Sequence, residues 1–396
     1  MIENKHIVNP LDFGAKGDGV SDDSTILQNV IDSFETEGQG ILWIPKGYSF
    51  AIPHNLTLKS KSIDIMGGGE LRNGSLIIGD EGNGNVVYMY NRITNINIMN
   101  DSITDGSCGI VFKQAANVTI DHCTIGGFDK AIYMAPLVKT VVNMQLCQRV
   151  TVVDNHITLC NYGIYIDRNA NWNSNPDEWG YTIGDWTVTR NIFEAINISH
   201  IYAIGVDGLI CTENVFFFGN SGGKLENIRI MMGHYVIISH NQLFEAGREG
   251  IYIEDVANFN ISDNNIAWPG QRFYANGIFV NSTNKYRVVD ETQAASIISN
   301  NIIDRPTNSG VIIQNYMGFL NVIGNCIQYY GALDHFYGDK NQQRYTWGIA
   351  VDSKSRNINI ANNNVTSSAT IVQDEGYLLN KAHNTESNNI LNFSKF

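Results

Sequence analysis

The chain of 396 residues carries 26 Lys and Arg against 39 Asp and Glu, a formal net charge of −13. No basic stripe is present that could offset phosphate repulsion, so the composition argues against nucleic acid as a partner. No apolar run is long enough to span a bilayer, and Met1–His6 lack the basic start and apolar stretch of a secretory signal. We therefore expect a globular protein with no membrane segment and no signal peptide.

The first predicted element is a short amphipathic helix. Asp22-Asp23-Ser24 place acidic and capping residues at its positive end. Apolar residues with helical spacing follow at Ile26, Leu27, Val30, Ile31 and Phe34. We expect residues 1–50 to form an N-terminal cap, because unpaired strand edges at the open end of a stack would otherwise template further chains.

From about residue 51 to residue 370 the chain repeats one block, in which apolar alternation runs into an Asn and a Gly-Ile strand follows. The repeated residues are Asn155, Asn191, Asn214, Asn241, Asn264, Asn301, Asn325 and Asn363, and subtraction gives spacings of 36, 23, 27, 23, 37, 24 and 38. Coils this short with period-two alternation predict an all-β, right-handed parallel β-helix, with residues 371–396 as a C-terminal cap or tail. The Asn side chains are expected to stack as a buried amide ladder.

Six cysteines are scattered through the chain without paired C-x-x-C spacing: Cys108, Cys123, Cys147, Cys160, Cys211 and Cys326. They are interpreted as small buried thiols rather than disulfides or a zinc site. We expect no cofactor and no metal.

Two N-terminal segments carry a family resemblance. Asp12-Phe13-Gly14-Ala15-Lys16-Gly17-Asp18-Gly19-Val20-Ser21-Asp22-Asp23, followed by Gly40-Ile41-Leu42-Trp43-Ile44-Pro45-Lys46-Gly47, resembles the opening of the pectate-lyase-like β-helix superfamily, which includes bacteriophage tailspikes and appendage proteins. The resemblance implies action on a polysaccharide, or binding to one, and a homotrimer. The Asn-Thr-Asp, Gly-His-Gly and Arg-x-Lys motifs of polygalacturonases and the Asp-Pro-His-Glu motif of alginate epimerases are absent. No catalytic residue can therefore be transferred by motif.

The register of the coils indicates a candidate binding face. With the Ile of each Gly-Ile strand pointing inward, the next residue points outward, and the outward column reads Val111, Tyr133, Tyr165, Tyr202, Arg229, Tyr252, Phe279, Ile312 and Ala350. Adjacent coils stand about 4.8 Å apart, so the aromatic residues and the Arg form a stripe. The stripe either stacks sugars or protects the sheet by stacking on itself.

Carboxylates near this stripe are candidate catalytic groups. Asp207 and His234 share a column in neighbouring coils, one coil from Glu254 and Asp255, with Arg229 between Tyr202 and Tyr252. Such crowding could perturb proton affinities for acid–base chemistry. Alternatively, Asp207 only ends a strand in an Asp-Gly turn, and Glu254-Asp255 is a solvated turn.

Long insertions flank the Gly-Ile strands and could wall a groove above this face. They cover residues 169–185, 267–276, 282–294 and 329–347, and their aromatic residues could equally anchor each loop to the coil.

These observations predict a tailspike-like depolymerase of a bacterial surface or capsular polysaccharide, most simply a glycoside hydrolase located in a phage virion or released by lysis. Glu254 would be the acid, Asp207 or Asp255 the nucleophile or base, and Arg229 and His234 would hold sugar substituents. The further substrate-binding residues expected are Tyr165, Tyr202, Tyr252, Phe279 and Asp167. A lyase or uronate epimerase is the alternative, with Arg229 neutralising a uronate and Tyr202, Tyr252 or His234 as base. A non-catalytic glycan-binding spike is the third.

Overall fold

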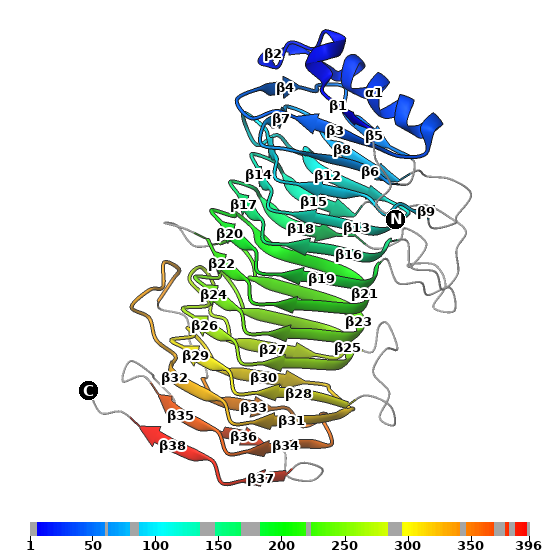
Figure 1. Ribbon diagram of the computed structural model, residues 1–396. Coiled ribbons are helices and arrows are strands. Elements are labelled where there is room, and N and C mark those ends of the chain that lie inside the picture. Colours follow the sequence, from blue (N-terminus) through cyan, green and yellow to red (C-terminus); the bar gives the residue numbers. More distant parts are fainter. Residues whose placement is uncertain are drawn as a thin grey trace. The chain divides into compact units, whose positions relative to one another are not determined.

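The computed structural model describes residues 6–59, 62–79, 87–134, 147–167, 183–218, 223–283, 295–340, 346–367, 377–379 and 385–393 (Figure 1). Its contacts divide the chain into two compact units, Met1–Glu194 and Ala195–Phe396. Both units consist of short parallel strands that repeat along the chain, and each is described by itself below.

In the first unit, one turn of the coil contains three strands. A complete turn runs through β12 (Cys108–Lys113), β13 (Ala115–Asp121) and β14 (Thr124–Gly126). The following strands are β15 (Lys130–Met134), β16 (Cys147–Val153), β17 (His156–Thr158), β18 (Tyr162–Ile166), β19 (Ile183–Thr189) and β20 (Ile192–Glu194). Each strand pairs in parallel with its equivalent one turn later, as in Ile110↔Ile132 and Ile132↔Ile164.

The earlier elements of this unit lead into the coil. They are β1 (Ile7–Val8), a 3-10 helix (Pro10–Phe13), β2 (Asp18–Asp22), α1 (Ser24–Glu37), β3 (Gly40–Ile44), β4 (Ser49–Ala51), β5 (Leu56–Leu58), β6 (Ile63–Gly67), β7 (Glu70–Arg72), β8 (Leu76–Gly79), β9 (Val87–Tyr88), β10 (Arg92–Thr94) and β11 (Asn97–Met99). The predicted helix is confirmed, and its apolar face is buried through Leu27, Val30, Ile31 and Phe34.

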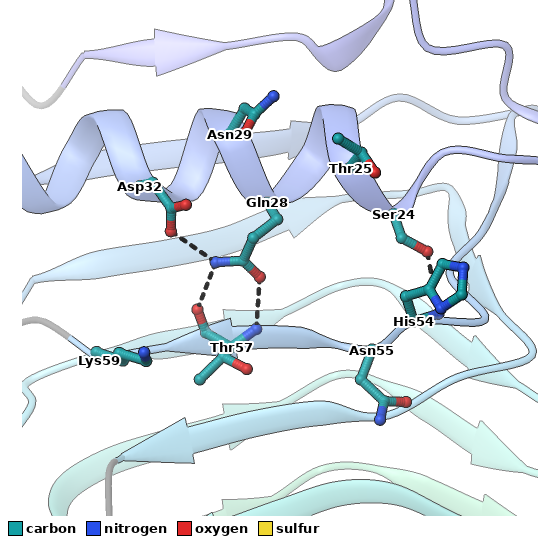
Figure 2. Close-up of a pocket in the computed structure, with 9 residues that line it drawn as sticks. All are labelled: Ser24, Thr25, Gln28, Asn29, Asp32, His54, Asn55, Thr57 and Lys59. Atoms are coloured by element: carbon teal, nitrogen blue, oxygen red, sulfur yellow. Dashed lines mark hydrogen bonds between the residues drawn. The ribbon is translucent and has the colours of Figure 1, made fainter.

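Helix α1 is fastened to strand β5 by a side-chain amide. The Gln28 Nε2 donates to the carbonyl oxygen of Thr57 at 3.0 Å, and the Thr57 amide donates to Gln28 Oε1 at 2.8 Å (Figure 2). These two hydrogen bonds resemble those that two paired strands exchange. The helix therefore satisfies backbone groups of β5 that an open sheet edge would leave unpaired.

Asp23 explains much of the N-terminal motif. Its carboxylate is 1% exposed and accepts the backbone amides of Lys16 at 2.7 Å and Gly17 at 2.9 Å. Gly17 has φ +60°, and a Cβ there would lie 2.9 Å from the ring of Tyr48. The loop before the helix therefore requires a glycine and a buried acceptor at these positions.

The second unit begins with long strands, each of which covers both the Gly-Ile segment and the segment before the Asn. These are β21 (Ser199–Thr212), β23 (Ile228–Ser239) and β25 (Ile251–Ser262), alternating with β22 (Val215–Phe217), β24 (Gln242–Phe244) and β26 (Asn265–Ala267). Later turns have separate strands: β27 (Ile278–Asn281), β28 (Ala295–Ser299), β29 (Ile302–Asp304), β30 (Val311–Gln314), β31 (Phe319–Ile323), β32 (Cys326–Tyr330), β33 (Ile349–Val351), β34 (Ile358–Ala361), β35 (Asn364–Ser367), β36 (Tyr377–Leu379), β37 (Thr385–Ser387) and β38 (Ile390–Phe393).

The predicted asparagine ladder is confirmed within each unit. In the first unit the Asn155 side-chain amide donates to Asn191 Oδ1 at 3.0 Å. In the second unit the same bond, 2.9–3.0 Å long, links Asn214, Asn241, Asn264, Asn301, Asn325, Asn363 and also Asn389. All eight predicted residues are at most 2% exposed. The residue before each of them has a positive φ, which turns the chain at this corner.

The interior of each unit is filled by the inward residues of the strands. The Ile or Val after each predicted Gly position is at most 1% exposed, for example Ile132 and Ile278. Gly277 shows why the position before it is small, because a Cβ there would lie 2.3 Å from Ile303 Cγ2. The six cysteines are free thiols, and all except Cys326 are buried.

Candidate functional site

The outward stripe of the second unit is built as the register predicts. Strand pairing aligns Tyr202 with Arg229, Arg229 with Tyr252, and Tyr252 with Phe279. The guanidinium carbon of Arg229 lies 4.3 Å from the ring centroid of Tyr252 and 5.7 Å from that of Tyr202. The Tyr252 and Phe279 rings are 5.4 Å apart. These side chains are partly exposed, so they cover the sheet and also present a surface to solvent.

Glu254 belongs to this cluster. It lies two residues beyond Tyr252 on β25, and the Tyr252 hydroxyl donates a hydrogen bond to its Oε2. Burial raises the pKa of Tyr252, and the charge of Glu254 raises it further. Tyr252 therefore keeps its proton and donates it in the hydrogen bond to the Glu254 carboxyl group. Arg229, Tyr252 and Glu254 form one connected polar group on the outer face.

Two carboxylates that the sequence interpretation missed adjoin the same cluster. Glu226 is 1% exposed, and its Oε1 lies 3.2 Å from Arg229 Nη1. Glu249 aligns with Glu226 in the next coil, because Ile228 pairs with Ile251. Burial and the charge of Glu226 raise the pKa of Glu249 to about 7. One signal in the sequence could have found them. Glu226 and Glu249 are 23 residues apart, the length of a short coil, and each stands two residues before a Gly-Ile strand.

Asp207 and His234 are neighbours, as predicted, but they lie beyond a bend. They are paired in β21 and β23. In both strands a left-handed residue precedes them, Gly205 at φ +85° and Met232 at φ +56°. The structure thus brings Arg229 and Glu254 together on the Gly-Ile segment and places Asp207 and His234 on the next corner. Gly208 has φ +80°, but Asp207 and Gly208 both lie inside β21, so the strand does not end in the Asp-Gly turn considered from the sequence.

Asp255 occupies the bend itself and points away from the outer face. It has φ +51° and is 1% exposed. Its carboxylate accepts hydrogen bonds from the hydroxyls of Ser282, at 3.2 Å, and Thr283. In this position Asp255 holds the end of β27 to β25.

The remaining predicted binding residues, Tyr165 and Asp167, belong to the first unit. Strand pairing aligns Tyr133 with Tyr165, and their rings are 5.9 Å apart. Lys130 Nζ lies 5.3 and 5.2 Å from the two ring centroids. Burial raises the pKa of Tyr133 to about 12, assisted by the charge of Asp167. The first unit therefore contains the same arrangement as the second, a cationic side chain next to two tyrosine rings.

Of the predicted loops, 267–276 and the described part of 329–347 pack on each other. Trp268 stacks on His335 at 4.4 Å, and Tyr274 stacks on Phe336 at 4.4 Å. The Tyr337 amide donates to the Gln271 carbonyl at 2.8 Å. These aromatic residues anchor the loops, in line with the alternative considered above. Residues 168–182, 284–294 and 341–345, including Trp172, Asp177, Glu178, Trp179 and Arg344, lie outside the described residues.

Within the described ranges, no group of three or more His, Cys, Asp or Glu side chains is arranged to hold a metal ion. In the same part of the chain, no helix has the length and apolar character needed to cross a membrane.

Comparison with known proteins agrees with this architecture. A family model for rhamnogalacturonase A/epimerase, pectate lyase-like, matches residues 7–176. The catalytic unit of the thermostable GH87 α-1,3-glucanase from Streptomyces thermodiastaticus strain HF3-3 superposes on all of this chain and on 70% of its own, with a TM-score of 0.57 and 12% identity. The enzymatically active domain of tailspike protein 2 from bacteriophage CBA120 superposes on 90% of this chain and 52% of its own, with a TM-score of 0.50 and 16% identity. Residues 7–176 are therefore similar to the pectate-lyase-like family, and the chain shares its fold, a right-handed parallel β-helix, with these solved structures.

One curated relative is similar in sequence. Over 188 residues the chain is 26% identical to depolymerase 1, capsule KN3-specific, of Klebsiella phage KN3-1. The alignment covers 42% of this chain and 24% of that protein, so the chain spans about a quarter of the length of the curated relative it matches.

Proposed function

We propose that this chain is a polysaccharide depolymerase that hydrolyses glycosidic bonds of a bacterial surface or capsular polysaccharide. The observation that carries the proposal is the cluster of Arg229, Tyr252 and Glu254 on the outer face, continued by Tyr202 and Phe279. Aromatic faces bind the apolar side of sugar rings, and a fixed carboxylate and guanidinium bind hydroxyls or acidic substituents. Similarity to a phage capsule depolymerase supports the same substrate class.

Within this proposal Glu254 acts on the glycan while Tyr202, Tyr252, Phe279 and Arg229 hold it. The hydrogen bond from Tyr252 orients the carboxyl group of Glu254, which we propose as the base or charge-stabilising group. Tyr165 and Asp167 would contact a glycan on the first unit. Asp207, Asp255 and His234 stay proposals as catalytic or binding groups, with the corner positions described above.

A lyase or epimerase is the second candidate, because Arg229 could neutralise a uronate carboxylate. Two observations weigh against it. Glu226 already pairs with the guanidinium at 3.2 Å, and the pKa of Tyr252, the nearest phenolic base, is raised rather than lowered. Hydrolysis therefore leads. The proposed setting is a phage virion and the proposed assembly a homotrimer, for which light scattering should give about three times the chain mass of 44.0 kDa.

The test is to incubate the protein with a panel of purified capsular polysaccharides, following new reducing ends and the absorbance of unsaturated uronates. Hydrolysis gives reducing ends without the absorbance, and lyase action gives both. Binding without either product would leave a glycan-binding spike and contradict the proposal.

Replacing Glu254 tests the site. Glu254→Gln keeps the shape and removes the charge, so we expect turnover to fall by about 100-fold or more while folding and glycan binding persist. Glu213→Gln, an exposed carboxylate at the asparagine corner, is the matched control and should keep full activity. Near wild-type turnover of Glu254→Gln would refute the assignment.

A further inference from the structure

A buried polar column lies where the Gly-Ile strands of the second unit begin. Glu226, Glu249 and Asn276 each precede their strand, β23, β25 or β27, by two residues. The pairs Ile228↔Ile251 and Ile251↔Ile278 place the three in successive coils, about 4.8 Å apart. Two carboxyl groups therefore stand side by side at one edge of the aromatic stripe.

Glu226 is a buried carboxyl group. Its Oε1 is paired with Arg229 Nη1 at 3.2 Å, and among the described residues its buried Oε2 has no hydrogen-bond partner. A buried polar oxygen without a donor is costly, so its presence calls for a reason. The neighbour in register is Glu249.

Glu249 is placed differently, because it is partly exposed and can reach a ligand. Its Oε1 accepts a hydrogen bond from Asn276 Nδ2 at 3.2 Å. The groups that face it are Glu226 in the preceding coil, Asn276 in the following coil and Arg248 beside it in the chain. Burial and Glu226 raise the pKa of Glu249 to about 7, against the smaller opposing effects of Arg248 and Asn276. Two like charges this close resist ionising together.

We infer that Glu249 is the proton donor of the proposed depolymerase, and that Glu226 and Arg229 are positioning residues that act through it. The inference rests on the proposed function. Glu249 gives its proton to the bridging glycosidic oxygen as the bond to the anomeric carbon breaks, and the bonding electrons stay on that oxygen. Water then adds to the anomeric carbon, and its released proton returns to the Glu249 carboxylate. One water is consumed and the residue is restored.

The other three acidic candidates fit this role less well. Glu254 already accepts the Tyr252 hydroxyl. Asp255 is buried and accepts the hydroxyls of Ser282 and Thr283. Asp207 lies beyond the bend in β21. Glu249 is partly exposed and stands beside a second carboxyl group, that of Glu226. Glu226 in turn pairs with Arg229, whose guanidinium carbon lies 4.3 Å from the ring centroid of Tyr252 in the stripe.

The experiment compares pH–rate profiles of the wild type, Glu249→Gln and Glu226→Gln on a capsular polysaccharide that the wild type cleaves. In the wild type, kcat/KM should fall as pH rises through about 7, the pKa of Glu249. Glu249→Gln should lower kcat by about 100-fold or more and lose this alkaline limb. Glu226→Gln should retain the limb but move it to lower pH, because removing the like charge lowers the pKa of Glu249.

The matched control is Asp263→Asn, which should keep the wild-type profile. Asp263 is an exposed carboxylate directly after β25, the strand that follows Glu249. Folding is checked by the Tm at pH 8. A carboxyl group with a raised pKa destabilises the fold once it ionises, so Glu249→Gln should not lower that Tm. A Glu249→Gln variant that keeps wild-type kcat, or keeps the alkaline limb, overturns the inference while the proposed function stands. A wild type that cleaves none of the polysaccharides overturns the proposed function instead.

Discussion

At the scale of single residues, the asparagine ladder is the most regular feature of the molecule. In the second unit, the side-chain amide of Asn241 donates to the next ladder oxygen, Asn264 Oδ1, at 3.0 Å and to the Cys211 carbonyl of the preceding coil at 2.9 Å. The Oδ1 of Asn241 accepts hydrogen bonds from both the backbone amide and the side-chain amide of Asn214, each at 3.0 Å. One side chain thus satisfies four buried polar groups.

Replacing a middle member should show this cost. For Asn241→Ala we expect the free energy of unfolding to fall by about 1–3 kcal/mol, because two donors and two acceptors in the interior lose their partner. Urea unfolding followed by circular dichroism measures the change. Asn265→Ala, an exposed position one residue after a ladder Asn, is the control and should be near neutral. Equal stability of the two variants would show that water replaces the ladder contacts.

The ladder could be predicted from the sequence because the same residue recurs at coil spacing in a shared context. The carboxylates that we propose as functional could not all be found in this way. Glu226 and Glu249 also recur at 23 residues, but only twice, so the repeat alone does not separate them from surface acids. What separates Glu226 is its burial and its ion pair with Arg229, and what separates Glu249 is its hydrogen bond from Asn276 and its place beside Glu226 in the next coil. These contacts depend on how the chain folds at this corner.

At the scale of elements, strand register was predictable and strand bending was not. Tyr202, Arg229 and Tyr252 stand 27 and 23 residues apart, and counting from the Ile that precedes each of them places all three in one column, which the strand pairing confirms. Asp255 forms the bend that follows Glu254 in β25, and Met232 forms the equivalent bend in β23. Both residues have a positive φ. Non-glycine residues rarely adopt this conformation, so their sequence gives little signal for it. Counting along the coils therefore aligns Asp207 with His234 but does not reveal the bend that separates this column from that of Glu254.

The helix cap gives a prediction at the same scale. Gln28→Ala removes both hydrogen bonds to Thr57, so the exposed side of β5 loses its partner. We expect amide hydrogen exchange at Thr57 to accelerate by about tenfold, the effect of losing roughly 1.4 kcal/mol of local protection. Asn29→Ala is the control, because Asn29 is exposed on the next position of the helix and points away from the pair (Figure 2). Unchanged exchange at Thr57 would mean that apolar packing alone holds the helix to β5.

At the scale of the whole molecule, stability comes from a repeated interior rather than from covalent links. Each coil contributes inward aliphatic residues, and in both units thiols take some of these places. Burial raises the pKa of Cys108 to about 11 and those of Cys123, Cys147 and Cys160 to about 12, and it raises the pKa of Cys211 as well. A thiol in this state is neither ionised nor accessible, so it reacts slowly.

Thiol labelling therefore reports on the integrity of the whole fold. With a maleimide reagent at pH 7.5, the native protein should label rapidly at Cys326 alone, the one thiol that is not buried. All six should label after unfolding in guanidinium, because exposure restores ordinary thiol reactivity. A Cys326→Ser variant is the matched control and should show no rapid labelling in the native state, read by mass spectrometry. Rapid native labelling of Cys147 or Cys211 would contradict the prediction, because these two thiols are fully buried in the first and the second unit respectively and can react only if the strands around them open.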